Sequence, residues 1–435
     1  MGSRSARAST TPAPHEATLT SYDAVLGTVW RDEWGRLLAL LVAQYRRLDV
    51  AEDGLGDAFE SAARAWPRDG VPTNPAAWLL TAARRRVIDR LRTEAVAART
   101  LPALAVEADL QERAERTMAD AGEVLVDERL RLVLLCAHPS LAPEHAAALT
   151  LRLVLGVSTE DIARLFLVST PTMAARLTRA RKRLAGAAFD VPSGPLLVER
   201  VAAVAAIARL AFTAGYAPGS GADVLRADVA GEAIRLVRVL RLTLAASGAT
   251  VPADLSRELD ALLALMLLQH ARRDARVRYD GDRPRLVLLP DQDRSRWRAD
   301  EIGEALDLLG PHVLAPGSPY LLEALVAAEH AVAPNPAATD WVRIAARYAE
   351  LEELTGSPVV RLNRAVAVAE ADGPLAGLAL LEGLDLPGHR LPAVRGELLR
   401  RAGREPEARA ALARALELCG NDAERAHLEE RLGSG

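Results

Sequence analysis

Residues 158–184 read STEDIARLFLVSTPTMAARLTRARKRL, which is the pattern of two short helices joined by a tight turn. Ser158 can cap the first helix, and Asp161 follows in a position close to that of a capping box. Apolar side chains then repeat at helical spacing at Ile162, Leu165 and Phe166. These residues predict a short support helix with one buried face.

The second helix of this pair is predicted to follow Ser169, which offers another cap, with Pro171 in the first turn. Its inward face is formed by Met173, Leu177 and Leu184. The candidate DNA contacts are Thr172, Arg176, Arg179, Arg181, Lys182 and Arg183. This division is typical of a recognition helix, because apolar side chains hold the helix in place while arginines reach phosphates and guanine edges. The alternative is a solvated basic face on an ordinary helix pair.

The bulk composition indicates a globular protein with a local basic surface. The chain has 435 residues, 50% of them hydrophobic, which suffices for two or three domains with buried cores. Because the net charge is -4 and the pI is about 6.1, any DNA-binding surface must be offset by acids elsewhere. The sequence contains no glycine-rich phosphate loop and no hydrolase or zinc-protease motif. We therefore expect no enzyme activity and no cofactor.

The cysteines and histidines do not suggest a metal site. Cys136, His138 and His145 lack a second ligand pair at the usual spacing, and Pro139 turns the chain between them. Cys136 and Cys419 are far apart in apolar surroundings, as expected for core residues in a reducing compartment. The prediction is a chain without bound metal.

The chain shows no targeting or membrane segment. Residues 1–20 are rich in Ala, Ser, Thr and Pro and lack a long apolar stretch, so they are predicted to be a disordered tail and not a signal peptide. No apolar run reaches transmembrane length. We expect a cytoplasmic protein without membrane contact.

A stiff loop and an arginine row lie in the first hundred residues. Helical patterns run through residues 22–97, interrupted at Pro67 by the segment WPRDGVPTNPAAW, residues 66–78, which is predicted to be a loop between two helices. The candidate contacts to single-stranded DNA are Asn74, Trp78, Arg84, Arg85, Arg86, Arg90 and Arg92. Flipped bases need a pocket and the backbone needs cations, which this segment can supply. The alternative is that Trp66 and Trp78 are core residues.

Together these segments resemble the extracytoplasmic-function sigma factors of bacterial RNA polymerase, over residues 22–191. Within that group the chain looks most like the members that carry a long C-terminal tetratricopeptide-like extension. The resemblance implies an all-α fold, with a sigma-2-like domain at 21–97 that captures the minus-ten element and a sigma-4-like helix-turn-helix domain at 127–191 that reads the minus-thirty-five element. It also implies two partners, promoter DNA and core RNA polymerase.

The segment AEDGLGDAF, residues 51–59, corresponds to the helix by which such factors dock on the polymerase clamp. The residues at matching places are Asp53, Asp57 and Phe59. The sequence departs from the family pattern at Gly56, where glutamine is usual, and at Arg85, where many members have asparagine. A glycine within a helix costs about 1 kcal/mol relative to alanine.

The linker and the C-terminal half complete the predicted organisation. The linker, residues 98–126, is acidic, and we leave open whether it lies near the RNA path or is a solvated tether. Residues 192–435 are predicted to be a helical extension with tetratricopeptide-like repeats, because Gly403 suits a turn while Ala408 and Ala415 suit close helix contacts. The extension is expected to regulate the sigma modules in cis, either by inhibiting them or by being required.

Residues 279–302 break the helical pattern of the extension and contain PDQDRSRW. A calcium loop is rejected, since Arg296 stands where glycine is demanded and Ile302 where glutamate is needed. We expect alternating Asp and Arg side chains to form a loop that joins two helix layers or meets another domain. A rival function for the chain is a free DNA-binding regulator whose repeat domain senses a peptide or ligand.

Overall fold

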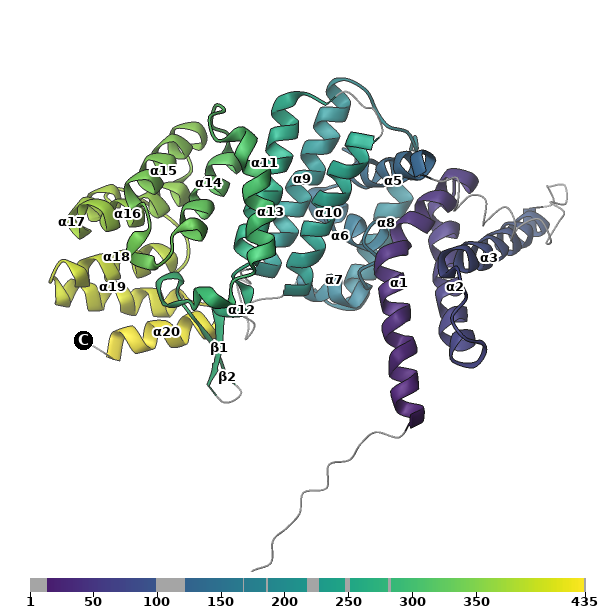
Figure 1. Cartoon of the computed structure of the whole chain (residues 1–435), viewed down its shortest axis with the longest axis horizontal. Helices are drawn as coiled ribbons and strands as arrows, with labels where there is room; N and C mark the ends of the chain where they lie inside the picture. The colour runs from purple at the N-terminus through teal and green to yellow at the C-terminus, as the bar shows by residue number, and fades with distance from the viewer. Residues whose placement is uncertain are drawn as a thin grey trace, which may run out of the picture. The chain divides into compact units, whose positions relative to one another are not determined.

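The structure is a computed structural model that describes residues 14–98, 122–166, 168–184, 187–216, 227–246, 251–280 and 283–433. The chain divides into two compact units, one of residues 1–200 with 243–249 and the other of residues 201–242 with 250–435. The predicted all-α fold is confirmed, with one small β-hairpin added (Figure 1). None of the helices in the described ranges combines the length and apolar character needed to cross a bilayer.

The N-terminal unit contains two groups of helices. Its first group is α1 (Pro14–Tyr45), α2 (Leu48–Asp69) and α3 (Pro75–Ala98), and its second is α5 (Gly122–Cys136), α6 (Pro143–Leu153), α7 (Thr159–Leu165) and α8 (Thr170–Arg183). Aromatic side chains organise the core of the first group. Trp30 stacks on Trp34 with ring centroids 4.2 Å apart, and Phe59 meets Trp30 edge-on at 4.6 Å. Helices α1 and α2 are thereby joined by one aromatic cluster.

Two predicted boundaries in this unit are wrong. Helix α1 begins at Pro14, so residues 14–20 are helical and not part of a disordered tail, while residues 1–13 lie outside the described residues. Proline is tolerated in the first turn, where its missing N–H has no partner to lose. Pro67 lies inside α2, which continues to Asp69, so the loop before α3 is only residues 70–74. The predicted linker lies mainly at residues 99–121, outside the described residues.

Gly54 is explained by the close approach of α2 and α3. A Cβ built on Gly54 would lie 2.8 Å from a methyl group of Val87 and 3.3 Å from the carbonyl oxygen of Ala83. Gly56, in contrast, has open space at the corresponding position. The helical cost of Gly54 is therefore offset by the contact it permits, whereas Gly56 has no packing reason.

The C-terminal unit is a series of helices in which neighbours pack on one another. Its first part contains α9 (Pro195–Tyr216), which begins in the N-terminal unit, α10 (Ala227–Ala246), α11 (Ala253–His270), α12 (Arg273–Arg276), α13 (Ala299–Leu309) and α14 (Pro319–Val332). The remainder contains α15 (Trp341–Thr355), α16 (Pro358–Asp372), α17 (Pro374–Leu380), α18 (Arg390–Arg401), α19 (Glu405–Leu418) and α20 (Asp422–Gly433). From α14 to α20 each helix contacts the next in the chain (Figure 1).

Helices α18 and α19 pack as closely as the alanine and glycine pattern predicts. Gly403 has a φ of 74° in the turn between them, and Ala408 and Ala415 are buried. A Cβ on Gly396 of α18 would lie 2.7 Å from the side chain of Leu412 on α19. Small residues therefore set the distance between these two helices.

The PDQDRSRW segment joins helix ends. The strands β1 (Val277–Asp280) and β2 (Arg283–Leu286) pair antiparallel just before it. Arg294 then donates from Nη1 to the carbonyl oxygens of His330 and Ala333, each at 2.6 Å, at the C-terminus of α14. Arg298 donates to Asp274 of α12 at 2.8 Å. The loop therefore contacts helix ends as expected, but Arg294 does so through backbone carbonyl oxygens, while Asp293 accepts a hydrogen bond from Ser295 within the loop.

Candidate nucleic-acid interface

Helices α7 and α8 form the predicted helix-turn-helix, and both N-terminal caps are present. The backbone N–H of Asp161 donates to Ser158 Oγ at 3.0 Å, and that of Thr172 donates to Ser169 Oγ at 3.4 Å. Ile162, Leu165, Met173, Leu177 and Leu184 are buried as predicted. The local sequence therefore determines both the start of each helix and the face that it buries.

The outward face of α8 has four cations available to a ligand. Arg179, Lys182 and Arg183 are exposed and Arg176 is partly exposed. Arg183 makes one long contact, from Nη1 to the carbonyl oxygen of Ser140 at 3.4 Å. Arg176 has no ion pair with any described residue. Thr172, also exposed, contacts Ser169 Oγ through its hydroxyl at 2.8 Å.

Arg181 instead points into the interior of the N-terminal unit, toward the buried carboxylate of Glu52. Its Nη2 lies 2.7 Å from Oε2 of Glu52 on α2, and Nε of Arg152 on α6 donates to Glu52 Oε1 at 2.9 Å. The Glu52 side chain is 3% exposed, and the two arginine side chains are 19% and 23% exposed. The prediction that Arg181 contacts DNA does not agree with this geometry, because its guanidinium compensates a buried charge.

Neither Glu52 nor Arg152 was identified from the sequence as important. Glu52 shares a face of α2 with Leu55 and Phe59, both buried. A charge at an apolar position of an amphipathic helix is the signal that could have revealed it, since such a group needs a partner. The partner itself, 100 positions away, was not recognisable.

A second contact joins α1 to the loop before α7. Trp30 donates from Nε1 to the carbonyl oxygen of Gly156 at 2.7 Å. Gly156 has a φ of 70°, and a Cβ there would lie 2.7 Å from that same nitrogen. Arg46 donates to the carbonyl oxygen of Phe189 at 3.1 Å. The helix-turn-helix and the first helical group are thus packed together in one unit.

The arginine row on α3 is divided between surface and interior. Arg85 and Arg86 are exposed and make no ion pair with the described residues, whereas Arg84 is only 7% exposed. Arg92 lies 3.8 Å from Asp89 across one turn. Arg90 bridges two carboxylates of α2, with 2.6 Å to Asp53 and 3.0 Å to Asp57. Arg84 is therefore a buried residue, and Arg90 links α3 to α2.

Asn74 and Trp78, the two candidate DNA contacts at the loop before α3, differ in exposure. Asn74 is exposed and its Oδ1 accepts a hydrogen bond from the backbone N–H of Ala77 at 3.0 Å, which caps α3. Trp78 is partly buried and meets the buried Trp66 edge-on at 5.9 Å. Of the two tryptophans, only Trp78 retains an accessible edge for a base.

Of the three predicted polymerase contacts, two are accessible. The side chains of Asp53 and Asp57 are 58% and 38% exposed although both pair with Arg90. Phe59 is 2% exposed because it belongs to the aromatic cluster of Trp30 and Trp34. The prediction of a direct contact through Phe59 does not agree with this burial.

Cys136 is a structural thiol of α5. It is completely buried, and burial, together with the charge of Glu52, raises the pKa of its thiol. His138 is partly buried, and its Nδ1 lies 2.8 Å from Ser140 Oγ. Burial therefore disfavours the thiolate form of Cys136.

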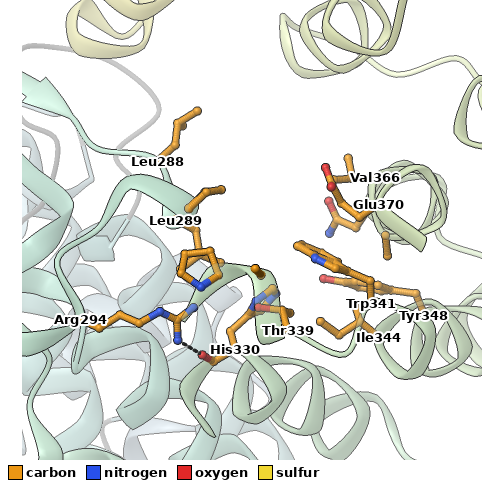
Figure 2. A pocket seen from close by; sticks show the side chains of 15 residues that line it. Leu288, Leu289, Arg294, His330, Thr339, Trp341, Ile344, Tyr348, Val366 and Glu370 are labelled. Atoms are coloured by element: carbon orange, nitrogen blue, oxygen red, sulfur yellow. Dashed lines mark hydrogen bonds between the residues drawn. The ribbon is translucent and has the colours of Figure 1, made fainter. Parts of the chain in front are cut away.

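The C-terminal unit contains a pocket of about 640 Å³ between α14, α15, α16 and the PDQDRSRW segment. Figure 2 shows Leu289 on one side and Val366 on the other, with Trp341 directed between them. Polar side chains at the pocket include His330, whose ring meets Trp341 edge-on at 5.2 Å. Its size and apolar lining are those of a small-molecule or peptide site.

Replacing His330 by glutamine is expected to remove part of the acid sensitivity of this unit. Burial, followed by the charges of Arg272 and Arg294, lowers the pKa of His330 from 6.5 to about 4. The folded state therefore favours the neutral ring, so His330 costs no stability above pH 6.5 and increasingly destabilises the folded state as the pH falls toward 4. We expect the wild type to lose about 3 kcal/mol more than the variant over this window, measured by urea unfolding. Equal losses in both proteins would contradict the assignment.

Comparison with known proteins agrees with this geometry. The family model "Sigma-70 region 2" matches residues 32–96, which include α2 and most of α3. The model "Sigma-70, region 4" matches residues 131–184, which include α6, α7 and α8. A third model, "Family of unknown function (DUF6596)", matches residues 200–312. The two sigma-70 matches thus fall on the two helical groups of the N-terminal unit.

A relative extends the similarity along almost the whole chain. An uncharacterized protein of Rhizobium meliloti (strain 1021) is 41% identical over 408 residues, which cover 91% of this chain and 92% of the relative. No solved structure matches the chain. Two sigma-70 regions in order, the second with an exposed basic helix, imply promoter recognition. The matches to region 2 and region 4 support a sigma-70 family factor.

Proposed function

We propose that this protein is a sigma factor of the extracytoplasmic-function group, which acts in the cytoplasm, binds core RNA polymerase and directs it to promoters with two elements. The observation that carries the proposal is the basic face of α8, with Arg176, Arg179 and Lys182 accessible on a capped recognition helix. Arg85 and Arg86 on α3 supply a second basic surface within the same unit. One surface suits duplex DNA and the other suits an opened strand.

The direct test is runoff transcription with purified core polymerase and the full-length protein. We expect promoter-dependent transcripts that disappear when the protein is omitted. Co-purification of the core enzyme with the tagged protein is the companion measurement. Absence of both complex formation and transcription from every tested promoter, including its own, would refute the proposal.

Arg176→Ala and Arg183→Ala are expected to weaken DNA binding in different ways. Arg176 lies mid-helix without an ion pair among the described residues, so it can contact a base edge, at a cost of about 1–3 kcal/mol for the cognate minus-thirty-five element only. Arg183 lies in the last turn, where a phosphate contact is expected. Its loss should weaken binding to all sequences and reduce the salt slope by about one. Uniform loss in both variants would contradict this division of roles.

The rival function is a free DNA-binding regulator with a sensor domain. The pocket beside Trp341 and Val366 favours it, because the pocket could hold a ligand. A duplex-binding regulator has no use for the arginine surface of α3. Specific duplex binding without any polymerase complex would favour this function over the sigma factor.

We further propose that the C-terminal extension, with its tetratricopeptide-like helix pairs, regulates the sigma modules in cis. Its tight α18 and α19 pair, spaced by Gly396, supports a repeat-like architecture. A chain truncated after Val191, checked for helicity by circular dichroism, is expected to differ from the intact protein in promoter output or polymerase affinity. Arg200→Ala is the matched control, because truncation also removes the hydrogen bond from Arg200 to the Leu134 carbonyl oxygen at 2.8 Å. A folded truncation equal to the intact protein would exclude regulation in cis.

A further inference from the structure

Three potential metal ligands converge near the end of the C-terminal unit. His389 directly precedes α18, Cys419 directly follows α19, and Glu424 lies in the first turns of α20. One ligand atom from each, a ring nitrogen, Sγ and a carboxylate oxygen, all lie within 4.8 Å of one another. His389 Nε2 lies 2.9 Å from Glu424 Oε2. Three separate elements thus bring nitrogen, sulfur and oxygen donors to one point.

The backbone around these side chains is held by its own hydrogen bonds. Asn421 Oδ1 accepts from the backbone N–H of Glu424 at 3.1 Å and so caps α20. Arg425 donates from Nη2 to the Cys419 carbonyl oxygen at 2.5 Å. Cys419 itself is 2% exposed, in a cluster with Leu412 and Leu428. The thiol and the carboxylate therefore have defined positions before any ion binds.

The donor set matches zinc in type and in charge. Zinc accepts thiolate, imidazole and carboxylate ligands, with bonds of roughly 2.0–2.3 Å in a tetrahedral arrangement. The three ligand atoms already lie within 4.8 Å of one another, close to the separations of ligands around one zinc ion. A thiolate and a carboxylate together neutralise the charge of a divalent cation. A neutral site avoids repulsion from Arg276, whose guanidinium interacts electrostatically with Glu424. Three protein ligands leave a fourth position for water or a small ligand.

We propose that His389, Cys419 and Glu424 bind a zinc ion that fastens α20 to α18 and α19. The expectation of a chain without metal considered only ligands close together in sequence, and this set is not close. The three ligands come together because α18, α19 and α20 pack against one another. Among the described residues, Cys136 belongs to no such group of three ligands.

The test uses the full-length protein, stripped with a chelator and titrated with Zn²⁺ and with Co²⁺. We expect one equivalent of either metal, a thiolate-to-cobalt charge-transfer absorption, and a higher unfolding temperature with zinc. Cys419→Ser should abolish the absorption, and His389→Gln and Glu424→Gln should each weaken binding at least about tenfold. Since His389 and Glu424 are partly exposed, these two variants decide the question if Cys419→Ser does not fold.

The matched controls are Cys136→Ala, His427→Gln and Glu417→Gln, which remove the same chemical groups elsewhere and should leave binding unchanged. Binding of one metal equivalent that is lost or weakened only in the variants of Cys419, His389 and Glu424 supports the site. Weak binding of equal strength in all six variants, or a cobalt absorption that persists in Cys419→Ser, would overturn it. Because the readout is metal binding, the result is independent of whether the protein initiates transcription.

Discussion

Replacing Glu52 by alanine is expected to lower the free energy of unfolding of the N-terminal unit by about 3 kcal/mol, because it leaves two largely buried arginines without their counter-charge. Arg152 and Arg181 meet the two oxygens of this one carboxylate from α6 and α8. Urea unfolding followed by tryptophan fluorescence gives the loss, and hydrogen exchange of α2 and α8 assigns it to this unit.

The control for Glu52 is an exposed ion pair of the same unit. Glu94 lies 3.0 Å from Arg47, and both side chains are more than 40% exposed. Exposed pairs contribute at most about 1 kcal/mol, so Glu94→Ala should change stability little. A double-mutant cycle of Glu52→Ala with Arg152→Ala should also reveal coupling between the two sites. If Glu52→Ala costs no more than Glu94→Ala, the buried carboxylate does not join α2 to α6 and α8.

Gly35→Ala is expected to be similarly disruptive, although it adds only one methyl group. A Cβ on Gly35 of α1 would lie 2.1 Å from the carbonyl oxygen of Val154, at the end of α6. Backbone cannot move aside as a side chain can, so α1 and α6 must separate at a cost of about 3 kcal/mol. Faster hydrogen exchange in both helices, together with a lower unfolding midpoint, is the expected readout.

Gly27 provides the matched control for Gly35 on the same helix. A Cβ there meets nothing within 4 Å, so Gly27→Ala should stabilise the protein by up to about 1 kcal/mol through helix propensity alone. Opposite signs for the two substitutions would support the packing of α1 against α6. A gain in stability from both would show that this packing is absent in solution.

Features determined by neighbouring residues were predicted well from the sequence. Ser158 and Ser169 cap their helices as expected, and Met173 and Leu177 face inward. Caps and helical periodicity depend on residues within one or two turns, and the chemistry of those residues can be read directly. The same applies to the exposed arginines of α8 other than Arg181. These local signals were enough to indicate a DNA-reading module.

Only the tertiary structure decided which groups remain available to a partner. Phe59 is buried in an aromatic cluster, and Arg181 pairs with Glu52. His389 lies beside Cys419 and Glu424. Each of these outcomes depends on contacts between residues far apart in the chain, whose distances are set by how whole helices pack. Periodicity and local spacing carry no information on such distances, so the sequence alone could not distinguish a free arginine from a paired one.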